Sequence, residues 1–143
     1  MSFDLKIDTG DLQVSTGGDL AVVEHSDKLI QDILKILMTP INGNRFFPWY
    51  GSPLSRSLIG AAFDGKFIAS IATNQVRNAL DTMKNLQEEQ LNGGQFVSSR
   101  EQIATIQDVT LERDIIDPRK FRVSITVLSK AFTTNRTQFQ VTL

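Results

Sequence analysis

Hydrophobic and polar residues alternate at the start of the chain. Phe3, Leu5 and Ile7 stand at every second position, with charged residues between them, which is the period of a half-buried β-strand. Glycine-containing turns follow at 9–11 and 16–19, and an apolar run resumes after each turn. Residues 3–24 are therefore predicted to form a small antiparallel meander or arm.

Two later segments carry apolar residues at helical spacing. The first spans 27–38, with Ser26 as its predicted N-cap and Thr39-Pro40 as its end. The second spans 65–90 and has charged and amide side chains on its opposite face. Both segments are predicted to be amphipathic helices. Shorter helices are predicted at 54–60 and, from the capping-box spacing of Ser98 and Glu101, up to Ala104; Asp64 is the predicted cap of the long helix.

Between these helices, residues 40–53 are rich in aromatic residues, proline and glycine. Phe46, Phe47, Trp49 and Tyr50 fall within five positions. Since so much aromatic surface is costly to leave in water, this segment is predicted to be an ordered loop packed over the core.

The final third of the chain returns to the period of a strand. Strands are predicted at 105–113, 121–127 and 137–143, separated by turn signals at Asp117-Pro118 and 133–135. Helices and strands kept apart in this way indicate an α+β fold, with a small antiparallel sheet, two main amphipathic helices and strand-rich termini. We expect one domain, residues 1–143, with 1–24 as a projecting β arm.

The amino-acid composition limits the kinds of catalytic and metal sites that the chain can form. The 143 residues include no cysteine and one histidine and carry a net charge of −1, so thiol chemistry and cysteine-based metal sites are excluded. His25 lies at a strand-to-helix junction, where a surface or capping role is expected. Acidic residues that could form a catalytic pair lie beside turns and helix starts, where they serve as caps: Asp19, Glu24 and Asp64. The sequence therefore predicts no catalytic residue, cofactor or metal.

The same features argue against nucleic acid and membranes as partners. The basic cluster of Arg119, Lys120 and Arg122 is short and is interrupted by Phe121. No window approaches the roughly 20 apolar residues of a membrane-spanning helix, and the start of the chain lacks the pattern of a signal peptide. We therefore expect neither nucleic acid nor a membrane as a partner.

Glu112 and Arg113 are neighbours on a predicted strand. Because adjacent side chains on a strand point to opposite faces, these two cannot pair with each other as residues at helical spacing would. Each must find its own partner or solvent.

Several short motifs occur in an order that resembles a known family. They are Gly18-Asp19-Leu20-Ala21, the helix at 27–38, Thr39-Pro40 with Gly43-Asn44-Arg45, and Pro48-Trp49-Tyr50-Gly51-Ser52. This order is similar to that of the baseplate wedge proteins that initiate the sheath of contractile phage tails, which have relatives in type VI secretion and tailocin baseplates. Asn44 stands where the family often has Glu, and Glu112-Arg113 is the best match to a Glu-Pro-Arg motif but lacks its proline.

The resemblance implies a non-enzymatic structural subunit of the virion tail baseplate, present in the host cytoplasm during assembly. Six copies would surround the tail tube, and the partners would be the sheath protein, other wedge proteins and the tube or hub. Extended arms of the first sheath ring would add as strands at the C-terminal strand, at Gln138, Phe139, Gln140 and Val141. The other residues implied in partner contacts are Glu112, Arg113, Arg45, Trp49 and Tyr50.

Two alternatives stay open. Because lysozyme-like labels have been attached to relatives in this family, the first is a tail-associated, lysozyme-like glycan hydrolase, which requires a buried acid facing another carboxylate. The second is a small binding module unrelated to tails.

Overall fold

Three long antiparallel strands form the main sheet of the computed structural model, which describes residues 2–54, 56 and 65–142. The strands are β5 (Ile103–Arg113), β6 (Lys120–Ser129) and β7 (Thr134–Thr142), in the order β5-β6-β7. Their alternating side chains give the sheet one apolar face, because residues directly opposite each other point to the same side. On β6 the odd-numbered residues Phe121, Val123, Ile125 and Val127 are all buried.

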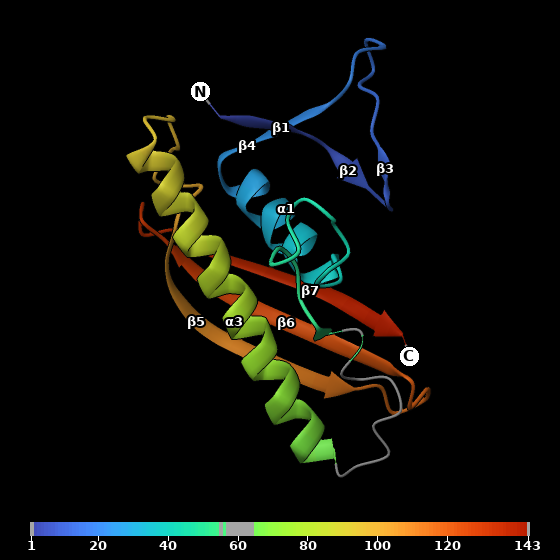
Figure 1. The fold of residues 1–143 in the computed structure, drawn as a ribbon. Coiled ribbons are helices and arrows are strands. Elements are labelled where there is room, and N and C mark those ends of the chain that lie inside the picture. Colours follow the sequence, from blue (N-terminus) through green and yellow to red (C-terminus); the bar gives the residue numbers. More distant parts are fainter. Residues whose placement is uncertain (1, 55, 57–64, 143) are drawn as a thin grey trace.

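Two helices cover that apolar face (Figure 1). They are α1 (His25–Met38) and α3 (Gly65–Asn92). Leu29, Ile33 and Ile36 of α1 meet Val76 and Leu80 of α3 in one buried cluster with the sheet. The observed α+β architecture, with an antiparallel sheet and two main helices, confirms the predicted fold class.

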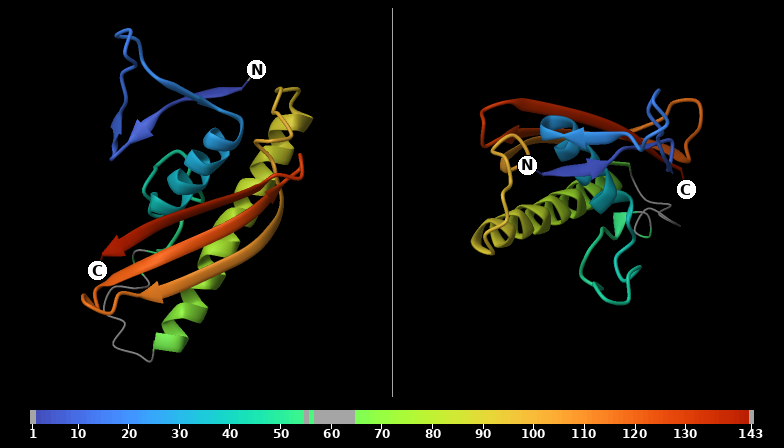
Figure 2. Two further views of the ribbon diagram at one scale, coloured as in Figure 1. Left: turned by 180° about the vertical axis from the view of Figure 1, so that it is seen from behind. Right: turned by 90° about the horizontal axis from the view of Figure 1, so that it is seen from above.

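The N-terminal residues form two small ribbons of their own. β1 (Phe3–Leu5) pairs with β4 (Val22–Glu24), and β2 (Ile7–Asp8) pairs with β3 (Asp11–Leu12), both antiparallel. None of these strands joins the main sheet, and the loop between β3 and β4 stands away from it (Figure 2). Gln31 of α1 anchors the arm, since its Oε1 accepts from Ile7 N–H at 2.9 Å and its Nε2 donates to Leu5 O at 2.8 Å.

Some local predictions were wrong. Helix α1 begins at His25, with Glu24 rather than Ser26 at the cap position and no side-chain cap. The segment 98–102 is a turn leading into β5, so the capping-box spacing does not start a helix there. The predicted helix at 54–60 and the cap at Asp64 fall largely or wholly outside the described residues.

Candidate functional site

The outer edge of β7 is the first candidate site, and the hairpin turn before it determines which backbone groups face outward. Ser129 N–H donates to Thr133 O at 2.9 Å, and these two residues directly follow the last pair of the β6–β7 register, Leu128 and Thr134. Because hydrogen-bonded pairs alternate along an antiparallel ladder, the odd-numbered residues of β7 bond to β6. The N–H and C=O groups of Gln138 and Gln140 therefore point away from the sheet.

No strand among the described residues pairs with that outer edge. The side chains of Gln138 and Gln140 are exposed, while Phe139 and Val141 are half-buried against the core. The two apolar residues of β7 thus serve the protein's own core, and the alternation predicted from sequence holds at these four positions.

A groove lies beside this strand. It has a volume of about 220 Å³, and its walls come from the end of α1, from Leu54 and from the end of β7: Leu37, Met38, Leu54, Phe139, Gln140, Val141 and Thr142. A strand added along β7 would place its inward-facing side chains over the same apolar face, since alternate residues share a face.

The outer face of the sheet holds a row of polar residues. Glu112 is opposite Arg122, and Arg122 is opposite Gln140, so one side chain from each strand forms the row. Glu112, Arg113 and Gln140 also line one pocket of about 370 Å³, together with Ile115 and Ile116 of the β5–β6 turn. The structure therefore brings three of the predicted partner-binding residues together.

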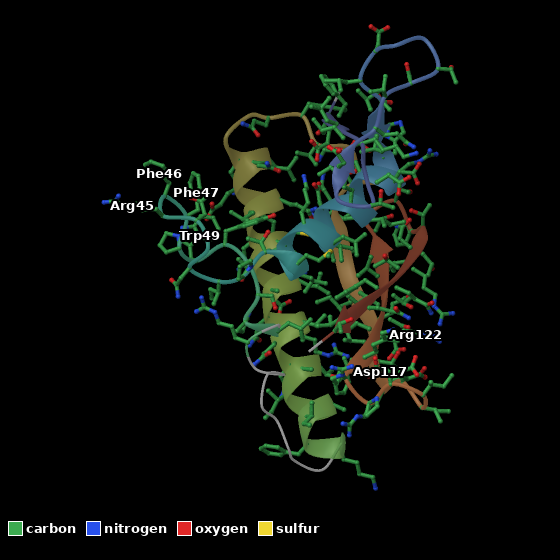
Figure 3. All side chains as sticks on the ribbon, turned by 90° about the vertical axis from the view of Figure 1, so that its right-hand side faces the viewer. Arg45, Phe46, Phe47, Trp49, Asp117 and Arg122 are labelled. Carbon is green, nitrogen blue, oxygen red and sulfur yellow. The ribbon has the colours of Figure 1, made fainter. Side chains whose placement is uncertain are left out.

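Arg113 points to the other face, as neighbouring strand residues must. Its guanidinium carbon lies 5.6 Å from the ring centroid of Phe121, and its Nε donates to Pro118 O at 2.7 Å. Asp114 and Asp117 accept backbone N–H bonds within the same turn, and these bonds hold the pKa of each carboxyl below its usual value. Figure 3 shows Asp117 and Arg122 on the side of the molecule away from the aromatic loop.

The prediction that the loop at 40–53 packs its aromatic residues over the core was wrong for three of the four. Phe46 is 84% exposed, and Phe47 and Trp49 are also exposed. With Arg45 they stand off the body of the molecule (Figure 3). The rings of Phe47 and Trp49 contact each other instead, with their centroids 5.9 Å apart. Only Tyr50 packs against the core.

Tyr50 lines a different pocket, of about 370 Å³, between the N-terminal arm and the two helices. In the wall of this pocket, Lys35 Nζ forms an ion pair with Asp4 and lies 2.7 Å from Asp32 Oδ1. Burial works against the charge on Asp4, but the hydrogen bond and the charge of Lys35 outweigh it and lower the pKa of Asp4. Burial likewise opposes the charge on Lys35, whose carboxylate partners raise its pKa. Burial raises the pKa of Tyr50.

Glu101 is the residue in this pocket that sequence reasoning missed. It was assigned to a helix cap, but it lies directly ahead of β5 and is 1% exposed. Its Oε1 accepts from His25 N–H at 3.3 Å, and its Oε2 has no hydrogen-bond partner. No local sequence signal marks Glu101 as buried, because its hydrogen-bond partners His25 and Gln87 lie 76 and 14 positions away in the chain.

The described part of the chain contains no group of three or more His, Cys, Asp or Glu side chains placed to hold a metal ion. Its helices are too short or too polar for any of them to cross a membrane.

The chain resembles a known protein in its structure but not in its sequence. Neither a family model nor a curated protein matches the sequence. The fold is similar to the crystal structure of a candidate tail lysozyme from Geobacter sulfurreducens, with a TM-score of 0.62 and 17% sequence identity over 86% of this chain and 96% of that one. The chain therefore shares the fold of a protein named as a tail lysozyme.

This neighbour also corrects one expectation. The sequence was interpreted as non-enzymatic, but a lysozyme is an enzyme, and the matched protein is named as one. The expectation that the chain is not an enzyme is therefore contradicted and is not kept.

Proposed function

We propose that this chain is a baseplate wedge subunit of a contractile tail that starts sheath assembly by accepting an extended segment of a sheath subunit as a fourth strand beside β7. One observation carries the proposal. The edge of β7 presents the N–H and C=O groups of Gln138 and Gln140 outward, with no strand of the described chain beside them. Such an edge pairs readily with another chain.

Two further features support this role. The groove beside β7 offers apolar walls for the inward-facing side chains of an added strand, so the partner's sequence as well as its backbone can be recognised. The fold is also similar to that of a protein named as a tail lysozyme, and the order of motifs resembles that of the wedge family.

The test replaces an outward N–H without disturbing the internal ladder. Proline is tolerated on an edge strand where its missing N–H faces outward, so Gln138→Pro is expected to fold and to block pairing with an added strand. Tails assembled with this variant would show baseplates without sheath in electron micrographs. Normal sheath growth on the variant baseplates would overturn the proposal.

Two matched variants make the result specific. Gln138→Ala removes the same side chain but keeps the N–H, and it is expected to support normal sheath growth. Thr137→Pro removes an N–H that bonds to β6, and it is expected to destabilise the protein itself. A defect shared by Gln138→Ala would assign the effect to the side chain instead of the backbone.

A glycan hydrolase is the second candidate. The name of the structural neighbour favours it, and so does the buried Glu101, which shares its pocket with Asp4 and Asp32. A buried acid and a second carboxylate are the groups that glycoside hydrolysis requires. Purified protein would then release soluble fragments from peptidoglycan, and Glu101→Gln would abolish the release while Glu88→Gln, a change on the exposed side of α3, would not.

A further inference from the structure

The pocket beneath the N-terminal arm is lined by more acidic than basic side chains. Its charged lining residues are Asp4, Lys28, Asp32, Lys35 and Glu101, which are three carboxylates and two ammonium groups. Both lysines are already paired, because Lys28 Nζ lies 3.0 Å from Asp32 Oδ2 and Lys35 binds both Asp4 and Asp32. Glu101 is therefore the one carboxylate of this lining without a lysine partner.

The protein holds Glu101 firmly in place. Gln87 Nε2 donates to the carbonyl oxygen of Glu101 at 2.7 Å, and the N–H of Glu101 donates to Ser98 O at 3.0 Å. On the carboxylate, Oε1 receives the N–H of His25, and the Nδ1 of that histidine lies 3.8 Å away. Oε2 is buried and has no partner among the described residues.

An unpartnered carboxylate oxygen is costly to bury, since it has lost its water without gaining a donor. A fold that fixes such a group at the wall of a pocket is suited to a donor from outside. A cationic donor would complete the hydrogen bonding of Oε2 and also balance the larger number of acidic side chains in the lining.

The rest of the pocket favours a guanidinium over an ammonium group. Phe3 and Tyr50 supply aromatic rings, and Gln87 and Gln90 supply amides. Guanidinium is planar, stacks on aromatic rings and donates several hydrogen bonds at once, whereas ammonium is a compact and strongly hydrated charge.

We infer that this pocket receives an arginine side chain from another polypeptide, with Glu101 Oε2 as its main acceptor. Phe3, which is 63% exposed, and Gln90, which is also exposed, both line the pocket, so the pocket is open to a group from outside. The site is separate from the β7 edge and does not depend on the function proposed for that edge.

Methylguanidinium is the probe for this chemistry, and methylurea is its neutral counterpart of similar shape. In two-dimensional amide NMR spectra of the full chain at constant ionic strength, methylguanidinium is expected to shift the amides of His25, Glu101 and Gln102 saturably. Methylurea at the same concentration is expected to leave them unchanged. Equal shifts with both compounds, or no saturable shift with methylguanidinium, would overturn the inference without any variant having to fold.

Substitutions then locate the acceptor. Glu101→Gln keeps an oxygen for His25 N–H but loses the charge, and it is expected to weaken methylguanidinium binding roughly tenfold or more. Glu88→Gln removes a carboxylate from α3 that does not line the pocket, and it is expected to bind as the unmodified chain does. Equal binding by Glu101→Gln and the unmodified chain would refute the role of Glu101.

A last comparison identifies the source of the guanidinium. Arginine blocked at both ends resembles a residue within a polypeptide, while free arginine adds a charged amine and a carboxylate. The blocked form is expected to bind more tightly than free arginine. Tighter binding of the free amino acid would show that the ligand is a small molecule and would contradict the assignment to a polypeptide.

Discussion

Gln87 connects α3 to the start of β5, and replacing it tests how the buried turn at Glu101 is held. The side chain is 7% exposed, donates to Glu101 O at 2.7 Å and accepts from Ile103 N–H at 2.9 Å. Gln87→Leu removes both bonds and leaves two buried backbone groups without partners, at roughly 1–3 kcal/mol each. The apolar gain of leucine offsets about 1 kcal/mol, so a net loss of about 3 kcal/mol is expected.

Urea unfolding measures this loss directly. The midpoint is expected to fall with an unchanged slope, since the folded and unfolded chains expose about the same surface as before. In thermal unfolding, about 3 kcal/mol corresponds to a decrease in Tm of roughly 10 °C for a chain of this size. The amide hydrogen of Ile103 is expected to exchange faster with solvent than in the unmodified protein.

Gln90→Leu is the matched control. Gln90 lies one turn further along the same helix and is exposed, so its replacement is expected to change the free energy of unfolding by less than about 0.5 kcal/mol. If Gln87→Leu is as stable as this control, the two hydrogen bonds do not hold the turn, and the reasoning is wrong.

Three further outcomes are expected. The pKa of Asp4 is lowered from its ordinary value of 3.8. The ion pair of Asp4 with Lys35 therefore stabilises the fold fully at pH values above 3.8, and this stabilisation is lost as the pH falls through the lowered pKa. In urea unfolding, acidification should therefore lower the free energy of unfolding of Lys35→Met less than that of the unmodified protein. The difference should be roughly 0.5–1 kcal/mol for this partly exposed pair. Gly51→Ala should lower Tm more than Gly94→Ala, because both glycines have positive φ but only a Cβ at 51 would meet backbone, at 2.5 Å. Ile115→Ser should leave Tm within about 1 °C, since that side chain is fully exposed.

The predicted periodic elements were largely correct. Alternation over 121–127 and 137–143 located β6 and β7, and the spacing of apolar residues located α1 and α3 to within a few residues. These patterns are readable because the period of a strand or helix is imposed by its own backbone, whatever it packs against.

The aromatic loop shows where such reasoning fails. Sequence alone indicated that four aromatic residues had to be covered, yet only Tyr50 reaches the core. The buried face of the sheet is packed against α1 and α3, and Phe46, Phe47 and Trp49 remain exposed. Whether an apolar residue is buried depends on which segments compete for the same surface. The local sequence pattern does not show which segment will cover that surface.

Four features can be read directly from the order of residues, because each follows from a backbone period: the α+β class, the two helices, the polar–apolar alternation of β7, and the opposite directions of Glu112 and Arg113. Three others depend on how distant segments pack: which backbone groups of β7 face outward, the row of Glu112, Arg122 and Gln140, and the burial of Glu101 beside His25 and Gln87. Those relations join residues far apart in the chain, and they arise from strand register and helix packing.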